Sequence, residues 1–401
     1  MTKCTRREFL GMAGRAGAVG LAGGLSILNS VGCGGGGSTN MKPPDNPHDG
    51  NKELVNLVGD LHVHTSLSDG DESPDFALRY AKNVSKLDFC CITDHAESIA
   101  DDHLVALPYY RSLPAKFDRP GEFCVLYGYE WTSLDYGHRS VYSTDNSMPL
   151  LPSNDSAYSD IEDLWRKLSG YNVITVPHHP MIASTRVWWD YVNPAIERLV
   201  EFYSKWGLSL REGNMRPLYN AKAEHGVIRA LNAGRRYGLL CGTDSHMSRP
   251  GSLLFEERPD SLLYPRPGTV GVWATAHTRE AIFDALKQRR CYGMTGTRVR
   301  LDFSVNKSIM GTEIGAVSSP LIAFHVSCGV PISRISILKT AHNATVALNT
   351  YLPNSLEFSQ TYTDNEFVED SGYSIMVDLD NTDMAMCSPV WVDKLASSPL
   401  L

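Results

Sequence analysis

The stretch Gly59-Asp60-Leu61-His62-Val63-His64-Thr65-Ser66-Leu67-Ser68-Asp69-Gly70 decides how the rest of this 401-residue chain is interpreted. A mostly apolar run at 54–58 precedes it and is short enough to be one buried strand. Residues i and i+2 of an extended chain point to the same side, so His62 and His64 can converge on one divalent ion. The Ser-Asp-Gly that follows predicts a turn that brings the Asp69 carboxylate back toward the same point.

The same arrangement, a strand that ends close to a His, Asp or Glu, recurs along the chain. Strands are predicted at 54–58, 89–92, 123–126, 172–176, 199–203 and 238–241, the fifth of which could also be a helix end. Helices are predicted from 74 to 84, 160 to 170, 224 to 237 and 279 to 290, and residues 100–120, with three prolines, are expected to be irregular. Alternating strands and helices with polar residues at the carboxyl strand ends predict a β/α barrel with its active site at that face.

Ten side chains at these strand ends form a candidate metal site. They are His62, His64, Asp69, His95, Glu130, His138, His178, His179, Asp244 and His246. Imidazoles and carboxylates are the ligands that zinc and other first-row divalent ions bind in proteins. Each residue alone has a structural alternative, and His138 in particular could be a hydrogen-bonded loop residue. His178 and His179 are adjacent, so we expect only one of the two to face an ion, with the other supporting it.

The pattern of apolar and polar residues changes after residue 297. From 298 to 401 apolar and polar residues alternate without a helical pattern, which predicts a β-sandwich-like unit. We therefore divide the chain into a signal segment (1–33), a flexible tether (34–52), the β/α barrel with the candidate metal site (53–297) and this C-terminal unit. Seven cysteines remain after Cys33, an odd number without a C-x-x-C pair, so a disulfide framework is not expected.

The N-terminus predicts export. Thr5-Arg6-Arg7-Glu8-Phe9-Leu10 is a twin-arginine pattern followed by a Gly/Ala-rich apolar stretch, although a disordered tail is an alternative. Cys33 allows a lipoprotein, with Ser30 where leucine would be usual, so the protein is expected to be periplasmic or membrane-anchored on the outer side. The formal net charge is −8 and no Lys/Arg-rich run occurs, which predicts that nucleic acid is not a partner.

The motifs taken together resemble those of the PHP (polymerase and histidinol phosphatase) superfamily. The resemblance is carried by the HxH and SDG of 59–70, by Thr93-Asp94-His95 and by Asp244-Ser245-His246. Glu130-Trp131-Thr132 and Pro177-His178-His179 are most similar to CehA/McbA-type metallohydrolases. This resemblance implies a distorted, TIM-like β/α barrel that holds two or three divalent ions, namely Zn, Mn or Fe.

The resemblance also implies a ligand set for each ion. One ion would be held by His62, His64, Glu130 and Asp244. Glu130 would bridge to a second ion, held also by His138 and by His178 or His179. A third would be held by Asp69, His95 and His246, with Asp69 where some members have histidine. Asp94 would orient one of the imidazoles from behind.

We therefore expect an exported metal-dependent hydrolase that uses a metal-bound hydroxide, with a small-molecule ester or phosphoester as substrate. A phosphoesterase is the leading interpretation. Hydrolysis of a carboxylic or carbamate ester, or a non-catalytic metal-dependent binding protein, is the alternative. Glu130 and Asp244 are the expected catalytic carboxylates. Arg139 is expected to receive an anionic group, as are Arg186 and Arg249, although a solvated loop position is equally compatible with each arginine.

Overall fold

The computed structural model describes residues 47–49, 52–213, 215–253, 266–316 and 318–396. The predicted signal segment at 1–33, with Arg6, Arg7 and Cys33, lies outside the described residues, as does most of the predicted tether. In the described part, no helix has both the length and the apolar character needed to cross a membrane.

The chain is a mixed α/β protein built around one large sheet. Its central path runs β12-β11-β3-β4-β5-β6-β7. These strands are β3 (Val55–Asp60), β4 (Phe89–Cys91), β5 (Cys124–Trp131), β6 (Arg139–Ser143), β7 (Val173–Pro177), β11 (Thr269–Ala274) and β12 (Cys291–Met294). Strands β3, β4 and β5 are parallel, whereas β6 is antiparallel to both β5 and β7. The predicted strands of this region are confirmed, and the β6 hairpin is an addition.

A second, three-stranded sheet contains β8 (Leu199–Ser204), β9 (Gly207–Leu208) and β10 (Gly238–Cys241), with β8 parallel to β10. A two-residue pair, β1 (His48–Asp49) with β2 (Lys52–Glu53), precedes β3. Among the described strands no ladder joins β7 to β8, so the predicted TIM-like barrel is not confirmed. The physical reason is that β6 and β11 enter antiparallel to their neighbours, which interrupts the repeated β/α unit that closes such a barrel.

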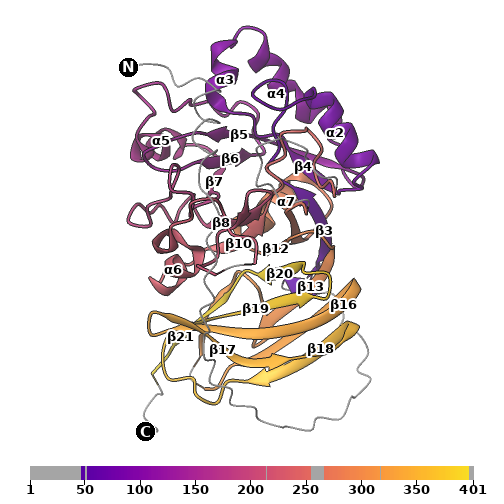
Figure 1. The fold of residues 1–401 in the computed structure, drawn as a ribbon, viewed down its shortest axis with the longest axis vertical. Coiled ribbons are helices and arrows are strands. Elements are labelled where there is room, and N and C mark those ends of the chain that lie inside the picture. The colour runs from indigo at the N-terminus through magenta and orange to yellow at the C-terminus, as the bar shows by residue number, and fades with distance from the viewer. Residues whose placement is uncertain (1–46, 50–51, 214, 254–265, 317, 397–401) are drawn as a thin grey trace, which may run out of the picture.

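The helices lie outside the strands, and Figure 1 shows α2, α3 and α4 grouped at one end of the molecule. They are α2 (Pro74–Asn83), α3 (Ala96–Asp101), α4 (Ala106–Phe117), α5 (Ile161–Leu168), η1 (Ala223–His225), α6 (Val227–Asn232) and α7 (Arg279–Lys287). The irregular structure predicted for 100–120 is wrong at 106–117, where α4 forms. Pro108 falls in the first turn of α4, where an N–H has no intrahelical acceptor, and the helix also tolerates Pro114 in its interior. The helix predicted at 224–237 is shorter, because Gly226 is extended and separates η1 from α6.

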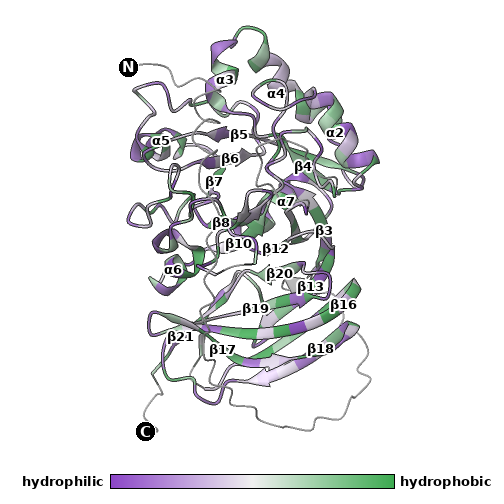
Figure 2. Ribbon diagram, viewed as in Figure 1, coloured by the Kyte–Doolittle hydropathy of each residue, from purple (hydrophilic) through white to green (hydrophobic). Residues whose placement is uncertain are grey.

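The C-terminal strands extend the same sheet. They are β13 (Val299–Val305), β14 (Ser308–Ile309), β15 (Glu313–Ala316), β16 (Leu321–Ala341), β17 (Ala344–Tyr351), β18 (Ser355–Thr363), β19 (Ser371–Leu379), β20 (Met384–Cys387) and β21 (Val390–Lys394). Strand β16 pairs with β13 and β18 through its first part and with β17 and β19 through its second. Figure 2 shows hydrophobic and polar colours alternating along β16, as expected of a strand with one buried face. Since β20 pairs with β12, strands on both sides of residue 297 are hydrogen-bonded, and the domain division stays a prediction.

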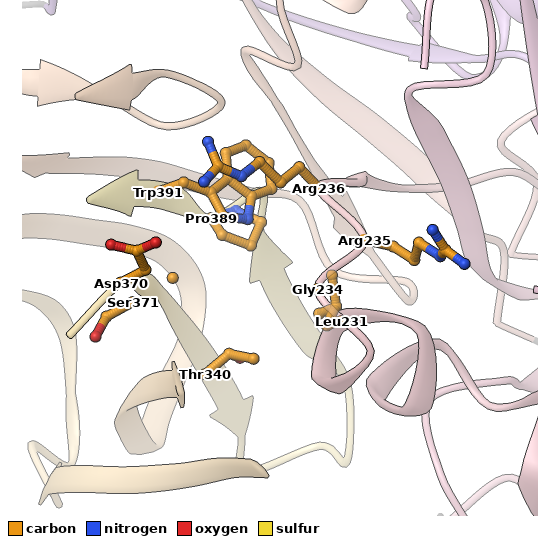
Figure 3. A pocket seen from close by; sticks show the side chains of 10 residues that line it. Leu231, Gly234, Arg235, Arg236, Thr340, Asp370, Ser371, Pro389 and Trp391 are labelled. Carbon is orange, nitrogen blue, oxygen red and sulfur yellow. The ribbon is translucent and has the colours of Figure 1, made fainter. Parts of the chain in front are cut away.

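A cleft of about 200 Å³ lies where the loop after α6 meets the C-terminal strands (Figure 3). Arg236 lines it and is paired with Glu313 at 2.6 Å and with Asp393. Trp391 lines it too, and the Arg289 guanidinium lies 4.4 Å from the centre of its ring. The Arg236 cation is thus neutralised by the carboxylates of Glu313 and Asp393. None of the ten candidate metal ligands lines this cleft.

Candidate metal centre

Asp60, the last residue of β3, joins the first motif to the last. Its buried carboxylate accepts hydrogen bonds from Thr243 Oγ1 at 2.6 Å, from Thr243 N at 3.0 Å and from Gly251 N at 2.9 Å. A parallel bridge between Val63 and Ser245 continues the contact. The His-x-His segment and the Asp-Ser-His segment are therefore held side by side, although Asp60 and Thr243 are 183 residues apart in the sequence.

Asp94 braces the loop that follows the His-x-His pair. Its carboxylate accepts hydrogen bonds from Thr65 N and Thr65 Oγ1, each at 2.6 Å, and from Ser68 Oγ at 2.5 Å. Asp94 was expected to orient one of the imidazoles from behind. Ser68 Oγ also lies 3.5 Å from Nδ1 of His64, so Asp94 reaches that imidazole through the Ser68 hydroxyl.

The structure brings all ten predicted residues into one cluster of possible ligands. Four groups could each hold an ion, with one ligand atom per residue and all ligand atoms of a group within 4.8 Å of one another. The groups are His62–His64–Asp244, His62–Glu130–His178, His138–His178–His179, and His64–Asp69–His95–His246. Neighbouring groups share His62, His64 or His178, so the cluster is continuous.

Glu130, on β5, lies at the centre of this cluster. Its Oε2 is 3.1 Å from His62 Nε2 and 3.2 Å from His64 Nε2. Its Oε1 is 2.7 Å from His138 Nδ1 and 3.4 Å from His178 Nε2. The two oxygens of one carboxylate therefore face different sets of histidines, which is the arrangement that a bridging ligand requires.

Asp244 supplies a second buried carboxylate on the side of the His-x-His pair. Its Oδ1 is 3.4 Å from His62 Nε2 and 3.2 Å from His64 Nε2. The backbone of Asp244 has a φ of +53°, in the left-handed region that few non-glycine residues adopt. Such local strain is typical of a side chain that the surrounding structure holds in place for function.

Asp69 completes the group nearest to solvent. Its Oδ2 is 3.2 Å from His246 Nε2, and its Oδ1 is 3.6 Å from both His64 Nδ1 and His95 Nε2. The side chain of Asp69 is 46% exposed, whereas those of His62, His64, Glu130 and His178 are at most 2% exposed. The open side of the cluster is therefore the side on which Asp69 lies.

His178 and His179 both belong to the cluster, contrary to the expectation that only one could face an ion. The backbone of His179 has a φ of +33°, which turns the chain back at this residue. The two rings consequently lie only 4.4 Å apart between centroids, and His179 lies 5.0 Å from the ring of His138. Sequence spacing alone assumes extended backbone and could not anticipate this turn.

The electrostatics of the cluster favour a bound cation. Burial would raise the pKa of Glu130, but His95 and His178 hold it well below its usual value, so the carboxylate is ionised. Burial likewise opposes the charge on Asp244, and His62 and His64 keep its pKa well below normal. Burial and the neighbouring His62 lower the pKa of His178 to about 4, so His178 is the neutral imidazole that metal ligation needs.

Unpaired nitrogens inside the cluster support the same interpretation. Nε2 of His138 and Nδ1 of His178 are buried and have no hydrogen-bond partner among the described residues. Buried polar atoms in proteins are nearly always hydrogen-bonded, and each exception calls for an explanation. Nε2 of His64 is likewise buried without a hydrogen-bond partner in the described part of the chain, and it lies 3.2 Å from both Glu130 Oε2 and Asp244 Oδ1. A divalent ion beside these carboxylates would supply the partner that His64 lacks, so the residues present fit a metal. The unpaired nitrogens of His138 and His178 lie on the ring sides opposite to those that face Glu130.

Glu201, on β8, is a functional candidate that the sequence interpretation missed. Its buried carboxylate lies 3.1 and 3.2 Å from Nδ1 of His62. Burial raises the pKa of Glu201 to about 7, although His62 opposes the shift. The signal in the sequence is a single acid in the middle of an apolar strand, LVEFYS, where a charge is costly unless it has a specific partner.

Arg139, predicted to bind an anionic group, instead makes structural contacts within the protein. Its side chain is buried, and its Nε donates to Glu197 Oε2 at 3.2 Å. Its Nη1 donates to the carbonyl oxygens of Tyr136 and Gly137. These contacts hold the turn that precedes β6, and we assign Arg139 no contact with a substrate.

Comparison with known proteins gives relatives of undefined function. A family model described as a protein of unknown function (DUF3604) matches residues 256–333. An uncharacterized protein of Chlamydia trachomatis is 25% identical over 367 residues, and one of Chlamydia pneumoniae is 24% identical over 365. Each match covers 84% of this chain, which spans 57% of the length of these relatives.

Solved structures resemble the fold at low identity. A two-domain protein from Bacteroides vulgatus, described as containing a predicted PHP-like metal-dependent phosphoesterase, has a TM-score of 0.44 and 15% identity, covering 86% of this chain and 96% of its own. The lesion-specific endonuclease Q of Pyrococcus furiosus has a TM-score of 0.37 and 14% identity, covering 58% and 56%. At these scores the likenesses assign neither an activity nor the CehA/McbA subtype.

One prediction about partners is nevertheless wrong. An endonuclease Q complex with a 27-mer duplex that carries an abasic lesion at the active site also resembles the chain, with a TM-score of 0.38, 13% identity and coverage of 58% and 57%. A net negative charge summed over the whole chain therefore does not exclude nucleic acid, because binding depends on the local field at the site. The predicted small-molecule ester has no support in these comparisons.

The loop that carries His138 depends on Gly137, and this dependence can be tested. Gly137 has a φ of +81°, and a Cβ there would lie 2.8 Å from the carbonyl oxygens of Thr185 and Arg186. Gly121 has a φ of +80° but open space around it. We expect Gly121→Ala to lose only the left-handed backbone cost of about 1–2 kcal/mol in free energy of unfolding.

Gly137→Ala should lose more stability than Gly121→Ala and should also weaken zinc binding, because the clash displaces His138. Denaturant unfolding of the metal-free proteins and zinc titration against a competing chelator measure the two effects. Equal stability and equal zinc affinity for the two variants would show that the close packing of this loop does not position the site.

Proposed function

We propose that this protein is a metal-dependent hydrolase that cleaves phosphoesters. The observation that carries the proposal is the position of Glu130, whose two carboxylate oxygens lie within 3.4 Å of imidazole nitrogens from four different histidines. A buried carboxylate shared in this way is suited to bridge two cations. The resemblance of the sequence motifs to the PHP superfamily is consistent with this site.

Two or three divalent ions would be held by residues that the structure already brings together. His62, His64 and Asp244 would hold one ion and share Glu130 with a second. The second would be held by His138, His178 and His179, and a third by Asp69, His95 and His246. Zinc, manganese and iron all accept such mixed imidazole and carboxylate ligands.

When bound, such ions lower the pKa of a coordinated water and neutralise charge that develops on substrate oxygens. The chain's own residues complement this chemistry by keeping Glu130 and Asp244 ionised and His178 neutral. Clustered cations would favour the dispersed negative charge of a phosphate over the single carbonyl oxygen of a carboxylic ester. Substrate would approach past Asp69, the most exposed residue of the cluster.

Glu130→Gln tests the bridging role. The substitution preserves shape but removes the charge and one good oxygen ligand. Loss of even an outer-shell partner typically costs about 10–100-fold in metal affinity or activity, and we expect at least that for Glu130, with more than one ion lost. His246→Ala should deplete one ion only. Elemental analysis of the purified variants counts the ions that remain.

Hydrolysis is followed in parallel with p-nitrophenyl phosphate, bis-p-nitrophenyl phosphate and p-nitrophenyl acetate. Asp364→Asn is the matched control, because Asp364 is a buried carboxylate just after β18 that accepts from Lys339 Nζ and from the Tyr373 hydroxyl, and an amide oxygen can do the same. Full metal content and unchanged turnover in Glu130→Gln would refute the proposal. Turnover of the acetate alone would identify a carboxylic esterase, and metal binding without any turnover a binding protein.

We also propose export by the twin-arginine route, directed by Arg6 and Arg7, with Cys33 as a possible point of lipid attachment. Replacing both arginines by lysine should leave the precursor in the cytoplasm, which cell fractionation and immunoblotting measure. The control is a double change to lysine at Arg235 and Arg236, far from the N-terminus. Normal amounts of the Arg6/Arg7 variant outside the cytoplasm would refute this proposal.

A further inference from the structure

We infer that Glu201 is a positioning residue that holds His62 in the one orientation and tautomer in which it can ligate an ion. The inference rests on the proposed metal centre and assigns a role to a residue that lies behind it. Glu201 belongs to β8, a strand that contributes none of the ten predicted ligands. It would act on the metal only through His62.

The contact between Glu201 and His62 is close and fully buried. The two carboxylate oxygens lie 3.1 and 3.2 Å from Nδ1 of His62, and the side chains are 1% and 0% exposed. In the described part of the chain, His62 is the hydrogen-bond partner of this carboxylate. An ionised carboxylate only accepts hydrogen bonds, so with Glu201 ionised it is Nδ1 of His62 that carries the shared proton.

This proton fixes what the other side of the ring can do. With Nδ1 protonated, Nε2 is the nitrogen that can offer a lone pair to an ion. Nε2 is also the atom that faces the predicted ligands, at 3.1 Å from Glu130 and 3.4 Å from Asp244. A carboxylate that accepts from the distal nitrogen of a ligating histidine sets both tautomer and ring direction in many metal sites.

Gly242 makes room for this pair. A Cβ at Gly242 would lie 2.4 Å from Glu201 Oε2 and 2.6 Å from His62 Cβ, so no other residue fits without displacing one of them. Gly242 stands two residues before Asp244 in the segment Gly242-Thr243-Asp244. The same short segment therefore supplies a ligand and the space in which Glu201 reaches His62.

Two substitutions separate positioning from simpler roles. Glu201→Leu fills the space without a hydrogen-bond acceptor, and Glu201→Gln removes the charge but keeps an amide oxygen that can accept from Nδ1. If Glu201 positions His62, zinc affinity should fall about 10–100-fold in Glu201→Leu and be partly restored in Glu201→Gln. A packing role predicts no loss in Glu201→Leu, and a role of charge alone predicts equal losses in both.

Zinc affinity is measured on the full chain by competition with a chromogenic chelator, and ion content by elemental analysis. Histidine ¹⁵N NMR of the zinc-loaded protein should show His62 with a protonated Nδ1 and a coordinated Nε2 in the wild type, and loss of that pattern in Glu201→Leu. Asp364→Asn is the matched control, since it changes a buried carboxylate just after β18 that contacts Lys339 and Tyr373 instead. Far-UV circular dichroism and unfolding of the metal-free proteins verify the fold.

Wild-type affinity and an unchanged His62 signal in Glu201→Leu would overturn the inference while leaving the metal centre intact. Equal losses in Glu201→Leu and Glu201→Gln would overturn the tautomer-holding role. If Glu201→Leu does not fold, the test is the zinc affinity of Glu201→Gln. An affinity equal to that of Asp364→Asn overturns the inference, and a loss confined to Glu201→Gln supports it. A wild-type protein that binds no zinc or manganese would instead remove the proposed function together with this inference.

Discussion

The structure depends on burying two ionised carboxylates, Glu130 and Asp244, inside a shell of histidines. A charge removed from water is expensive unless an opposite charge compensates it. In the cluster that compensation comes from the imidazoles, and the pKa of His64 is raised to about 10 because, against the effect of burial, Asp244 and Glu130 favour a positive charge there. A divalent ion would supply the same charge, and this is the electrostatic basis of the proposed metal centre.

The protein builds this centre with polar residues that are not themselves ligands. Asp60 fastens the end of β3 to Thr243, Asp94 braces the loop at Thr65, and Glu201 contacts His62 from β8. Each is buried and each joins segments that are distant in sequence. The sheet and these three carboxylates therefore determine where the candidate ligands lie.

The ten side chains that come together could be predicted from the sequence because one rule, that polar residues past the ends of buried strands converge, needs only local information. The antiparallel directions of β6 and β11 could not be predicted, since strand direction depends on pairing between distant segments. The predicted barrel assumed parallel strands throughout, and the structure does not confirm it. Glu201 was missed because its role appears only once His62 lies beside it. The turn at His179 and the burial of Arg139 likewise depend on tertiary contacts, which periodicity does not encode.

The most direct test of the central claim is diffraction from crystals grown with zinc or manganese, with data collected at the absorption edge of that metal. The proposed metal centre predicts anomalous peaks on both sides of the Glu130 carboxylate, one also ligated by His62, His64 and Asp244, and the other by His138, His178 and His179. A well-ordered cluster that shows no anomalous peak within ligand distance of Glu130, at saturating metal, would contradict it.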